Sequence, residues 1–324
     1  MKNVGKVNMT NVKKTLIGLT CAAALLTPMT AWSKSATAAA RATKVTSKLS
    51  IKLLYNARQL PSDVQPESVN GITLVPIRVV SDKLGGKITL NGKQITIIKG
   101  KSNLSLAIGA STAVINGKPV NLPIPVKVKS GRTLVPLRVI SEGLGVAVEW
   151  DSVSQFVWIG NKDVPKLEDA VKAVDIKPYL SYFSGKQGKI FISDGFSPTK
   201  TKARIIKEQD FPLEIAGDIY YRVDLAYFEG KEVTRAVTND KGVMGTSFYV
   251  LEKGKPARAR AEFFGIRENI GDFRIHYNRV VSSVDEADFG IKNYESFRIK
   301  QADYIGIFAP SDSVILLDNY FVNN

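Results

Sequence analysis

The strongest constraint on the fold is a fifteen-residue segment that occurs twice, sixty residues apart. Residues 71–85 read GITLVPIRVVSDKLG and residues 131–145 read GRTLVPLRVISEGLG, with ten identical positions. The upstream turns match at the same offset, Asn56-Ala57-Arg58 against Asn116-Gly117-Lys118. A self-similar period of this length indicates that one supersecondary unit was duplicated.

Each copy has the local signals of strands flanking a short helix. Asn116-Gly117 after apolar residues predicts a hairpin, and Pro136 stands where a helix can begin, because its missing N–H is harmless there. An apolar i, i+3, i+7 face follows, and Gly145 is placed for a left-handed cap. A second hairpin is expected around Asp151-Ser152. The fold prediction is α+β, a duplicated β-β-α-β-β module with its helix on the sheet.

These residues resemble a known family. TLVPLRVISEGLG, followed by VEWD and a short closing strand, resembles the copper amine oxidase N-terminal domain, or stalk domain, of secreted Gram-positive bacterial proteins, over residues 48–160. The first copy departs from the pattern, with Leu90-Asn91 in place of Trp-Asp. The resemblance implies a small sheet wrapped on a helix. It does not imply copper or oxidase chemistry, because the family's catalytic machinery belongs to another domain.

The first forty residues are predicted to be a signal peptide and processing region. Lys13 and Lys14 precede an apolar run, residues 16–26, that is shorter than the ~18 residues of a spanning helix. The chain is expected to be secreted or held at the cell surface, with no integral membrane segment after cleavage. The single cysteine, Cys21, lies in the removed segment, so disulfides and thiolate sites are excluded.

The charge is unevenly distributed along the chain. Residues 41–160 hold sixteen Lys/Arg and six Asp/Glu, a net charge of +10, whereas residues 161–324 hold twenty-four of each sign. A basic module outside the cell favours an anionic cell-wall polymer or polysaccharide as partner rather than nucleic acid. Alternatively, the charge only keeps the module soluble.

Candidate ligands for such a polymer are Lys127, Lys129 and Arg132, which cluster before the second TLVP segment. Arg78 and Arg138 recur at equivalent positions. They are interpreted as structural, each tying its helix to a nearby carbonyl or carboxylate.

Few residues suit catalysis, so no catalytic residue, metal site or cofactor is predicted and the chain is read as a non-enzyme. Asn293-Tyr294-Glu295 mimics the quinone motif of copper amine oxidases, but His276 is the only histidine and cannot form a copper cluster. His276 is interpreted as a strand residue. Glu214, Asp218 and Asp224 leave a glycan hydrolase as an alternative.

The second half is predicted to be a helix and linker, residues 161–187, followed by a β-rich domain of unknown family, residues 188–324. Alternating apolar residues from Ile219 to Phe228 give the clearest strand, continued after a turn by Val233 to Val237. Further strands are expected at 187–193, 203–208, 245–252, 258–266, 295–300, 303–309 and 313–318, which together favour a mostly antiparallel sandwich or barrel.

Paired aromatic residues in these strands place one ring on each face. Tyr220, Phe228 and Phe264 are predicted to point outward, where they form a platform for sugar rings or are covered by a neighbouring part of the chain. The leading hypothesis is a secreted, non-catalytic cell-wall protein with a stalk that acts as spacer or anionic-polymer binder and a β-sandwich binding domain. The alternatives are a glycan-active hydrolase targeted by the stalk, and a purely structural spacer.

Overall fold

The computed structural model describes residues 45–193, 198–240, 247–263 and 266–323. The predicted signal peptide and processing region therefore lies outside the described residues. The described residues belong to one compact unit, and all of their strand pairs except β14 with β2 and β16 with β25 are antiparallel.

The stalk is built from three small sheets. A central sheet has the order β11-β12-β5-β4, a joint sheet the order β13-β14-β2-β3, and a five-stranded sheet the order β10-β9-β8-β7-β6. The strands are β2 (Lys52–Tyr55), β3 (Arg58–Gln59), β4 (Glu67–Val69), β5 (Ile72–Pro76), β6 (Lys87–Asn91), β7 (Gln94–Lys99), β8 (Ser102–Ala107), β9 (Thr112–Ile115), β10 (Lys118–Asn121), β11 (Lys127–Lys129), β12 (Arg132–Pro136), β13 (Val148–Asp151) and β14 (Phe156–Ile159).

Both TLVP segments form the predicted strand-to-helix step. Helix α1 (Ile77–Lys83) follows Pro76 and helix α2 (Leu137–Leu144) follows Pro136, so a proline precedes the first residue of each helix. Gly145 ends α2 with a left-handed φ of 61°, as predicted. The Asn116-Gly117 hairpin between β9 and β10 is also confirmed, with positive φ at both residues.

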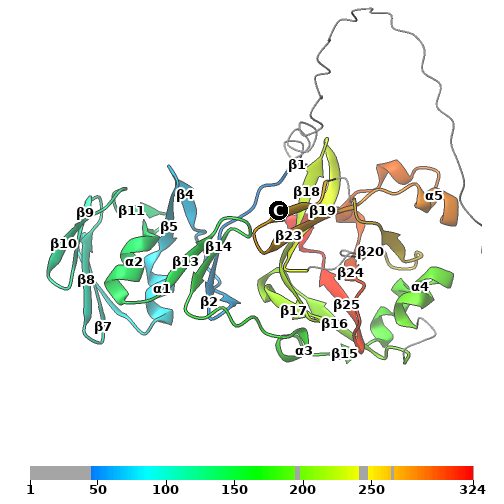
Figure 1. The fold of residues 1–324 in the computed structure, drawn as a ribbon, viewed down its shortest axis with the longest axis horizontal. Coiled ribbons are helices and arrows are strands. Elements are labelled where there is room, and N and C mark those ends of the chain that lie inside the picture. Colours follow the sequence, from blue (N-terminus) through cyan, green and yellow to red (C-terminus); the bar gives the residue numbers. More distant parts are fainter. Residues whose placement is uncertain (1–44, 194–197, 241–246, 264–265, 324) are drawn as a thin grey trace, which may run out of the picture. The chain divides into compact units, whose positions relative to one another are not determined.

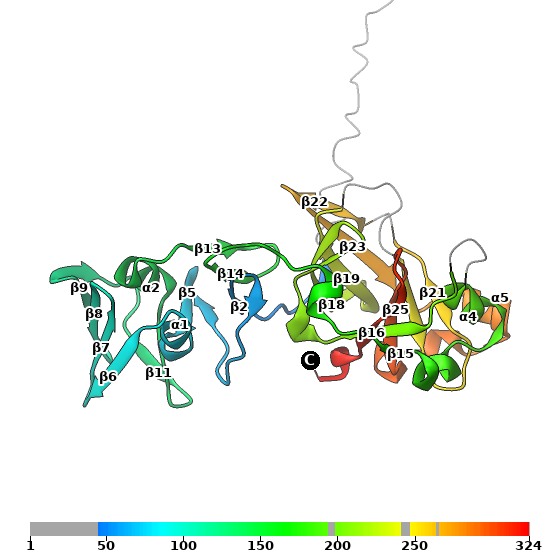
Figure 2. The ribbon, with the colours of Figure 1, turned by 90° about the horizontal axis from the view of Figure 1, so that it is seen from below.

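The two TLVP strands pair with each other around a local twofold axis. Val135 lies opposite Val75, and the flanking pairs Leu134–Pro76 and Pro136–Leu74 exchange equivalent positions. Helix α1 contacts β12 and helix α2 contacts β5, so each helix packs on the strand of the other half. In both views the helices lie between the five-stranded sheet and the central sheet (Figures 1 and 2).

The halves are more interwoven than a β-β-α-β-β unit predicts. Each half contributes a hairpin, a second hairpin, a helix and a third hairpin. The last hairpin of the second half, β13-β14, joins the first hairpin of the first half through a parallel pair, β14 with β2. The last hairpin of the first half joins the first hairpin of the second through β8. Neither half could therefore bury its core without the other, and the duplication itself stays an inference from the sequence.

The stalk core lies under both helices. Its buried residues include Val75 and Val135 from the central sheet, Val80 and Ile140 from the helices, and Ile97 from the five-stranded sheet, each fully buried. Burial of these branched aliphatic side chains stabilises the module without a disulfide.

The C-terminal part consists mainly of two six-stranded sheets. The first has the order β1-β18-β19-β23-β22, with β17 also pairing β18, and the second has the order β15-β16-β25-β24-β20-β21. The strands are β1 (Val45–Thr46), β15 (Val174–Asp175), β16 (Lys202–Ile206), β17 (Leu213–Ile215), β18 (Asp218–Phe228), β19 (Lys231–Thr238), β20 (Phe248–Leu251), β21 (Arg258–Arg260), β22 (Glu268–Ile270), β23 (Phe273–Arg279), β24 (Tyr304–Ile307) and β25 (Ser313–Asp318).

A core shared by both sheets includes Val223 and Ala236 from the first and Phe248, Ile305 and Leu317 from the second. Short helices surround the sheets: α3 (Leu167–Ala170), α4 (Gly185–Ile192), α5 (Val284–Phe289) and the 3₁₀ segments η3 (Lys177–Tyr182), η4 (Glu208–Asp210), η6 (Tyr294–Ser296), η7 (Ile299–Gln301) and η8 (Tyr320–Asn323). The coarse prediction of a β-rich, mostly antiparallel second half is confirmed.

Two local predictions are wrong. The expected strand at 187–193 is helix α4, which begins at Gly185 within the predicted linker, and the expected strand at 295–300 is two 3₁₀ turns. The helix predicted within residues 161–187 forms as the short helix α3, which ends at Ala170. Phe191 in α4 stacks on Tyr249 at 4.0 Å between ring centroids, so an aromatic contact distant in sequence outweighs the local preference.

The stalk and the C-terminal sheets are held together by strand pairing and hydrogen bonds, at a contact that we call the joint. Strand β1 precedes the stalk in the chain but pairs with β18. Arg222 on β18 is 5% exposed and donates to the carbonyl oxygens of Ser50 and Ser154 at 3.2 and 2.5 Å. Gln59 donates to the carbonyl oxygens of Glu208 and Phe211, both at 2.9 Å. These contacts fix the outer face of the joint sheet against the C-terminal part.

Candidate functional site

The five-stranded sheet of the stalk gathers lysines at one end. Register places Lys87 opposite Ile98, Lys99 opposite Ser102 and Lys118 opposite Ile115. Lys101 stands in the turn between β7 and β8, beside those positions. Lys83 ends helix α1, four residues before Lys87. We call these five residues the lysine end.

These lysines are accessible and lack acidic partners. Lys83, Lys87, Lys101 and Lys118 are exposed. The ammonium group of the half-buried Lys99 donates to the Leu144 carbonyl oxygen, which ends helix α2, at 3.4 Å. Within the described residues none of the five has a carboxylate within ion-pair distance.

The local sequence explains why the positive charge is uncompensated. No aspartate or glutamate occurs between Asp82 and Glu142, a stretch that contains the whole five-stranded sheet. A lysine ammonium is a compact, hydrated point charge on a flexible stem, so it matches an anion by charge rather than by fixed geometry. Several such charges at one sheet end suit a flexible polyanion.

The loop cations predicted from the sequence have intramolecular partners. Lys127 and Lys129 on β11 both contact Glu67 on β4, with Lys129 Nζ at 2.7 Å from the carboxylate. Arg132 contacts Asp63, Nη2 to Oδ2, at 2.6 Å. The Lys127 and Lys129 hydrogen bonds hold the pKa of Glu67 below its usual value, and Arg132 does the same for Asp63. These cations already balance carboxylates, which makes them weaker candidates than the lysine end.

The two recurrent arginines differ. Arg138 pairs with Glu142 one helical turn later, Nε to Oε1 at 2.5 Å, so its carboxylate partner lies in its own helix. Arg78 is exposed. The structural role predicted for these arginines is therefore seen for Arg138, as a contact within α2 that does not join the helix to another element.

Three aromatic residues were weighed as either an open platform for sugar rings or a covered surface, and the two that the structure describes, Tyr220 and Phe228, pack against neighbouring side chains. Tyr220 is 7% exposed and belongs to the core between the C-terminal sheets, so its predicted outward direction is wrong. A bulge between Tyr220 and Arg222 shifts the alternation along β18, which reverses the faces of the residues before it. Phe228 is half-buried against Phe263, with ring centroids 5.1 Å apart. Phe264 lies outside the described residues.

His276 is a buried strand residue on β23, as interpreted. Its Nδ1 lies 3.0 Å from Glu262 Oε1 and its Nε2 3.1 Å from Thr238 Oγ1. This is the connectivity of a hydroxyl–histidine–carboxylate relay, but Thr238 and His276 are both 0% exposed. Burial lowers the pKa of His276 more than Glu262 raises it. A hydroxyl that no substrate can reach stabilises the fold rather than attacking a bond.

The three acids weighed for glycan hydrolysis do not converge. Asp224 accepts two 2.7 Å hydrogen bonds from Arg222 and is part of the joint. Burial, followed by the nearby Asp240 carboxylate, raises the pKa of Asp218. Glu214 lies on β17, opposite Ile219. Asn293-Tyr294-Glu295 falls at a 3₁₀ turn, η6. In the described ranges no set of three or more histidine, cysteine, aspartate or glutamate residues is placed to hold a metal ion.

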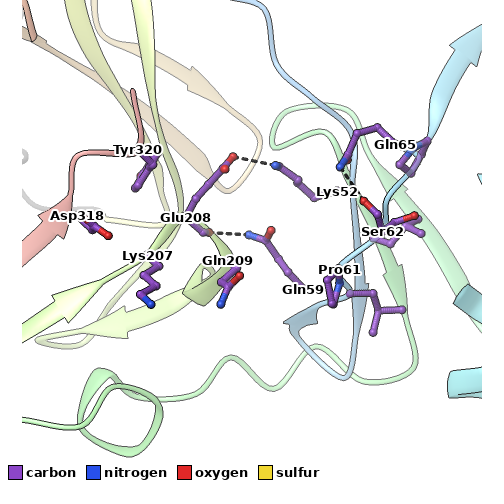
Figure 3. A pocket seen from close by; sticks show the side chains of 13 residues that line it. Lys52, Gln59, Pro61, Ser62, Gln65, Lys207, Glu208, Gln209, Asp318 and Tyr320 are labelled. Atoms are coloured by element: carbon purple, nitrogen blue, oxygen red, sulfur yellow. Dashed lines mark hydrogen bonds and ion pairs between the residues drawn. The ribbon is translucent and has the colours of Figure 1, made fainter. Parts of the chain in front are cut away.

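A polar hollow of about 360 Å³ opens beside the joint (Figure 3). Lys52 and Gln59 reach from the stalk towards η4, and Lys52 Nζ lies 2.8 Å from Glu208 Oε1. Its central charged groups are therefore already paired with each other, which marks the hollow as part of the joint rather than a ligand site.

Residues 54–159 match the family model described as copper amine oxidase N-terminal domain. The resemblance seen in the repeat is confirmed. This stalk-type domain is non-catalytic, and the match includes none of the strands of the two C-terminal sheets. No curated protein matches the chain. None of the helices that the structure describes has the length and apolar character needed to cross a bilayer.

Proposed function

We propose that this is a secreted, non-catalytic cell-surface protein whose stalk binds an anionic wall polymer through the lysine end. The observation that carries the proposal is four lysines at one end of the five-stranded sheet, with Lys83 at the end of helix α1 four residues before Lys87. None of the five has a carboxylate partner within the described residues. The export signal read from the sequence supports a location where phosphate- or carboxylate-bearing polymers are the available polyanions.

The expected affinity is modest and sensitive to salt. A lysine close to an anionic surface contributes about 1 kcal/mol, and the contribution falls off within a Debye length of about 8–10 Å. The lysine end therefore supports binding of repeated charges along a polymer more than binding of one small anion.

The decisive experiment is co-sedimentation of the full chain with cell walls that retain, or have been stripped of, their anionic polymer. A variant with Lys87, Lys99, Lys101 and Lys118 changed to Gln is compared with the wild type across a salt series. Four lysines at about 1 kcal/mol each contribute about 4 kcal/mol, so we expect roughly a thousandfold weaker binding for this variant at low salt.

The matched control removes the same charge elsewhere. Lys172, Lys231, Lys292 and Lys300 are exposed lysines of the C-terminal part. Changing all four to Gln should leave binding within about threefold, because exposed charges more than a Debye length of about 8–10 Å from a bound polymer are largely screened. Equal losses in the two variants would refute a localised site. Equal binding to stripped walls would refute the anionic polymer as ligand.

A further inference from the structure

A groove of about 740 Å³ runs along the stalk beside Trp150. It lies between the start of α2, strand β13 and the segment that follows β10. Leu137, Val148 and Leu122 line it with apolar surface. Its volume falls within the ~300–1,000 Å³ typical of small-molecule sites.

The polar groups of the groove are arranged as a matched pair. Arg138 and Glu142 lie at its edge and form an ion pair with each other. A sugar hydroxyl donates one hydrogen bond and accepts others, so a guanidinium beside a carboxylate satisfies both roles. A charged ligand would be attracted by one member and repelled by the other. The edge chemistry therefore favours a neutral polyhydroxylated ligand.

The half-buried indole of Trp150 adds a flat apolar surface. The apolar C–H face of a pyranose ring packs on such a ring while its hydroxyls stay at the polar edge. At the position equivalent to Trp150, sixty residues earlier, the first half of the stalk has Leu90, which is 55% exposed.

The other half also differs at the groove's remaining contacts. Ile72 and Pro123 line the groove, and their equivalents at the sixty-residue offset are Arg132 and Asp63. Those two residues form an ion pair with each other. The repeat therefore has an open apolar groove at one of two related positions and a charged bridge at the other.

A second hollow, of about 460 Å³, also includes Trp150 in its lining. Trp158, Tyr221 and Phe273 contribute further rings, with Tyr221 edge-on to both of the others. Its edge again carries an ion pair, Lys162 with Glu149 at 2.5 Å. The Lys162 ammonium lies 5.6 Å from the Trp158 ring centroid. Aromatic surface with a matched charge pair thus occurs twice around one tryptophan.

We propose that Trp150 is the centre of a binding track for a neutral oligosaccharide chain, which occupies the groove and extends across the indole into the second hollow. Two hollows that share one ring suit a ligand made of repeated units. The track uses none of the lysine-end residues, so it is independent of the proposed anion binding, and its affinity should be insensitive to salt.

The test is isothermal titration of the full chain with neutral pentasaccharides: β-1,4-linked N-acetylglucosamine, β-1,4-linked glucose and α-1,4-linked glucose. We expect one of them to bind, with affinity changed less than twofold between 50 and 500 mM salt. Trp150→Ala should weaken that binding at least tenfold, whereas Trp150→Phe should retain it within about threefold because a ring face remains.

Leu90→Ala is the matched control, because it truncates the equivalent position of the other half. It should leave saccharide affinity unchanged, and circular dichroism confirms that each variant is folded. Three results would overturn the proposal: no binding of any pentasaccharide, full binding by Trp150→Ala, or loss of binding in the lysine-end variant. The last result would assign the sugar to the anion site, while failure of anion binding would leave the track untouched.

Discussion

Arg222 provides the sharpest test of how the stalk is fixed to the C-terminal sheets. Its guanidinium donates twice to Asp224 at 2.7 Å and to two stalk carbonyl oxygens, and it lies 5.7 Å from the Phe156 ring centroid. Arg222→Met keeps an apolar stem of similar length but removes every one of these donors. The substitution leaves the 15%-exposed Asp224 carboxylate with Arg235 at 3.7 Å as its nearest cation.

The loss in the free energy of unfolding depends on how well the Asp224 carboxylate remains paired. Removing one partner of a buried ion pair costs about 3–5 kcal/mol, since the remaining charge stays desolvated. Because Arg235 still screens Asp224, we expect the lower end, ~3 kcal/mol in the free energy of unfolding. The double variant Arg222→Met/Asp224→Leu removes the carboxylate that Arg222→Met leaves unpaired, so it should recover part of that loss. Recovery stays incomplete because Arg235, whose side chain is 7% exposed, loses Asp224 as its partner.

Urea unfolding measures these differences, followed both by far-ultraviolet circular dichroism and by tryptophan fluorescence. Trp158, one of three tryptophans in the chain, lies next to Tyr221 at the joint, with ring centroids 6.4 Å apart, so part of the fluorescence reports on the joint. If Arg222→Met costs less than ~1 kcal/mol, or if the double variant is as unstable as the single one, the guanidinium does not hold the joint and the reasoning fails.

Three further predictions concern stability. Burial lowers the pKa of His276 in the folded chain, so near and below the ordinary histidine value of 6.5 the unfolded chain binds more protons than the folded chain. The free energy of unfolding should therefore fall as the pH drops through that region. Urea titrations at pH 7.5 and 5.5 measure this fall, and it should be smaller in His276→Gln. Gly306→Ala should destabilise by at least ~1–3 kcal/mol, because an added Cβ would stand 1.9 Å from the buried Tyr249 ring, and an unchanged melting temperature would contradict that packing. Glu67→Gln should cost no more than ~1 kcal/mol by the same urea assay, because its lysine partners are half-exposed.

The TLVP step was predictable because its signals are local. Proline before the helix and Gly145 after it fix the helix ends through backbone chemistry that any tertiary context preserves. The Asn116-Gly117 turn is predictable for the same reason, since both residues tolerate positive φ. Strand partners are different. The same hairpin signals are compatible with pairing inside one half or across to the other, and only the packed module selects the exchange of β14 onto β2.

The predicted outward direction of Tyr220 was wrong because it also depends on strand pairing. Strict alternation along β18 depends on an unbroken register with β19, and one bulge before Arg222 moves Tyr220 into the core. Another segment of the sequence does indicate which hairpin of the stalk is covered. Phe156-Val157-Trp158-Ile159 is apolar at every position, and all four residues are buried, which is the pattern of a strand covered on both faces. That run marks the hairpin which the C-terminal part covers.

The sequence predicts the charge of the candidate site but not its position on the stalk. The positive excess of residues 41–160 is visible in the sequence, but its location depends on the register that brings Lys87, Lys99 and Lys118 to one end of a sheet. Lys127 and Lys129 were favoured because they are close in sequence. Their partner, Glu67, lies sixty residues away and meets them only because β11 and β4 bring the two hairpins into one sheet.

Strand β2 of the joint sheet and strand β9 of the five-stranded sheet occupy equivalent positions in the repeat, yet one is buried and the other is exposed. Leu54 on β2 is fully buried in a cluster with Phe156, Trp158 and Tyr221, whereas Val114, its equivalent on β9, is 39% exposed. Backbone geometry cannot account for this, since both strands belong to the same kind of hairpin. The difference lies in the side chains: aromatic rings on one sheet, and lysines with no intervening acid on the other. One face of the stalk is therefore covered by the C-terminal part of the same chain, whereas the other is exposed and carries the lysines that we propose as the polymer-binding surface.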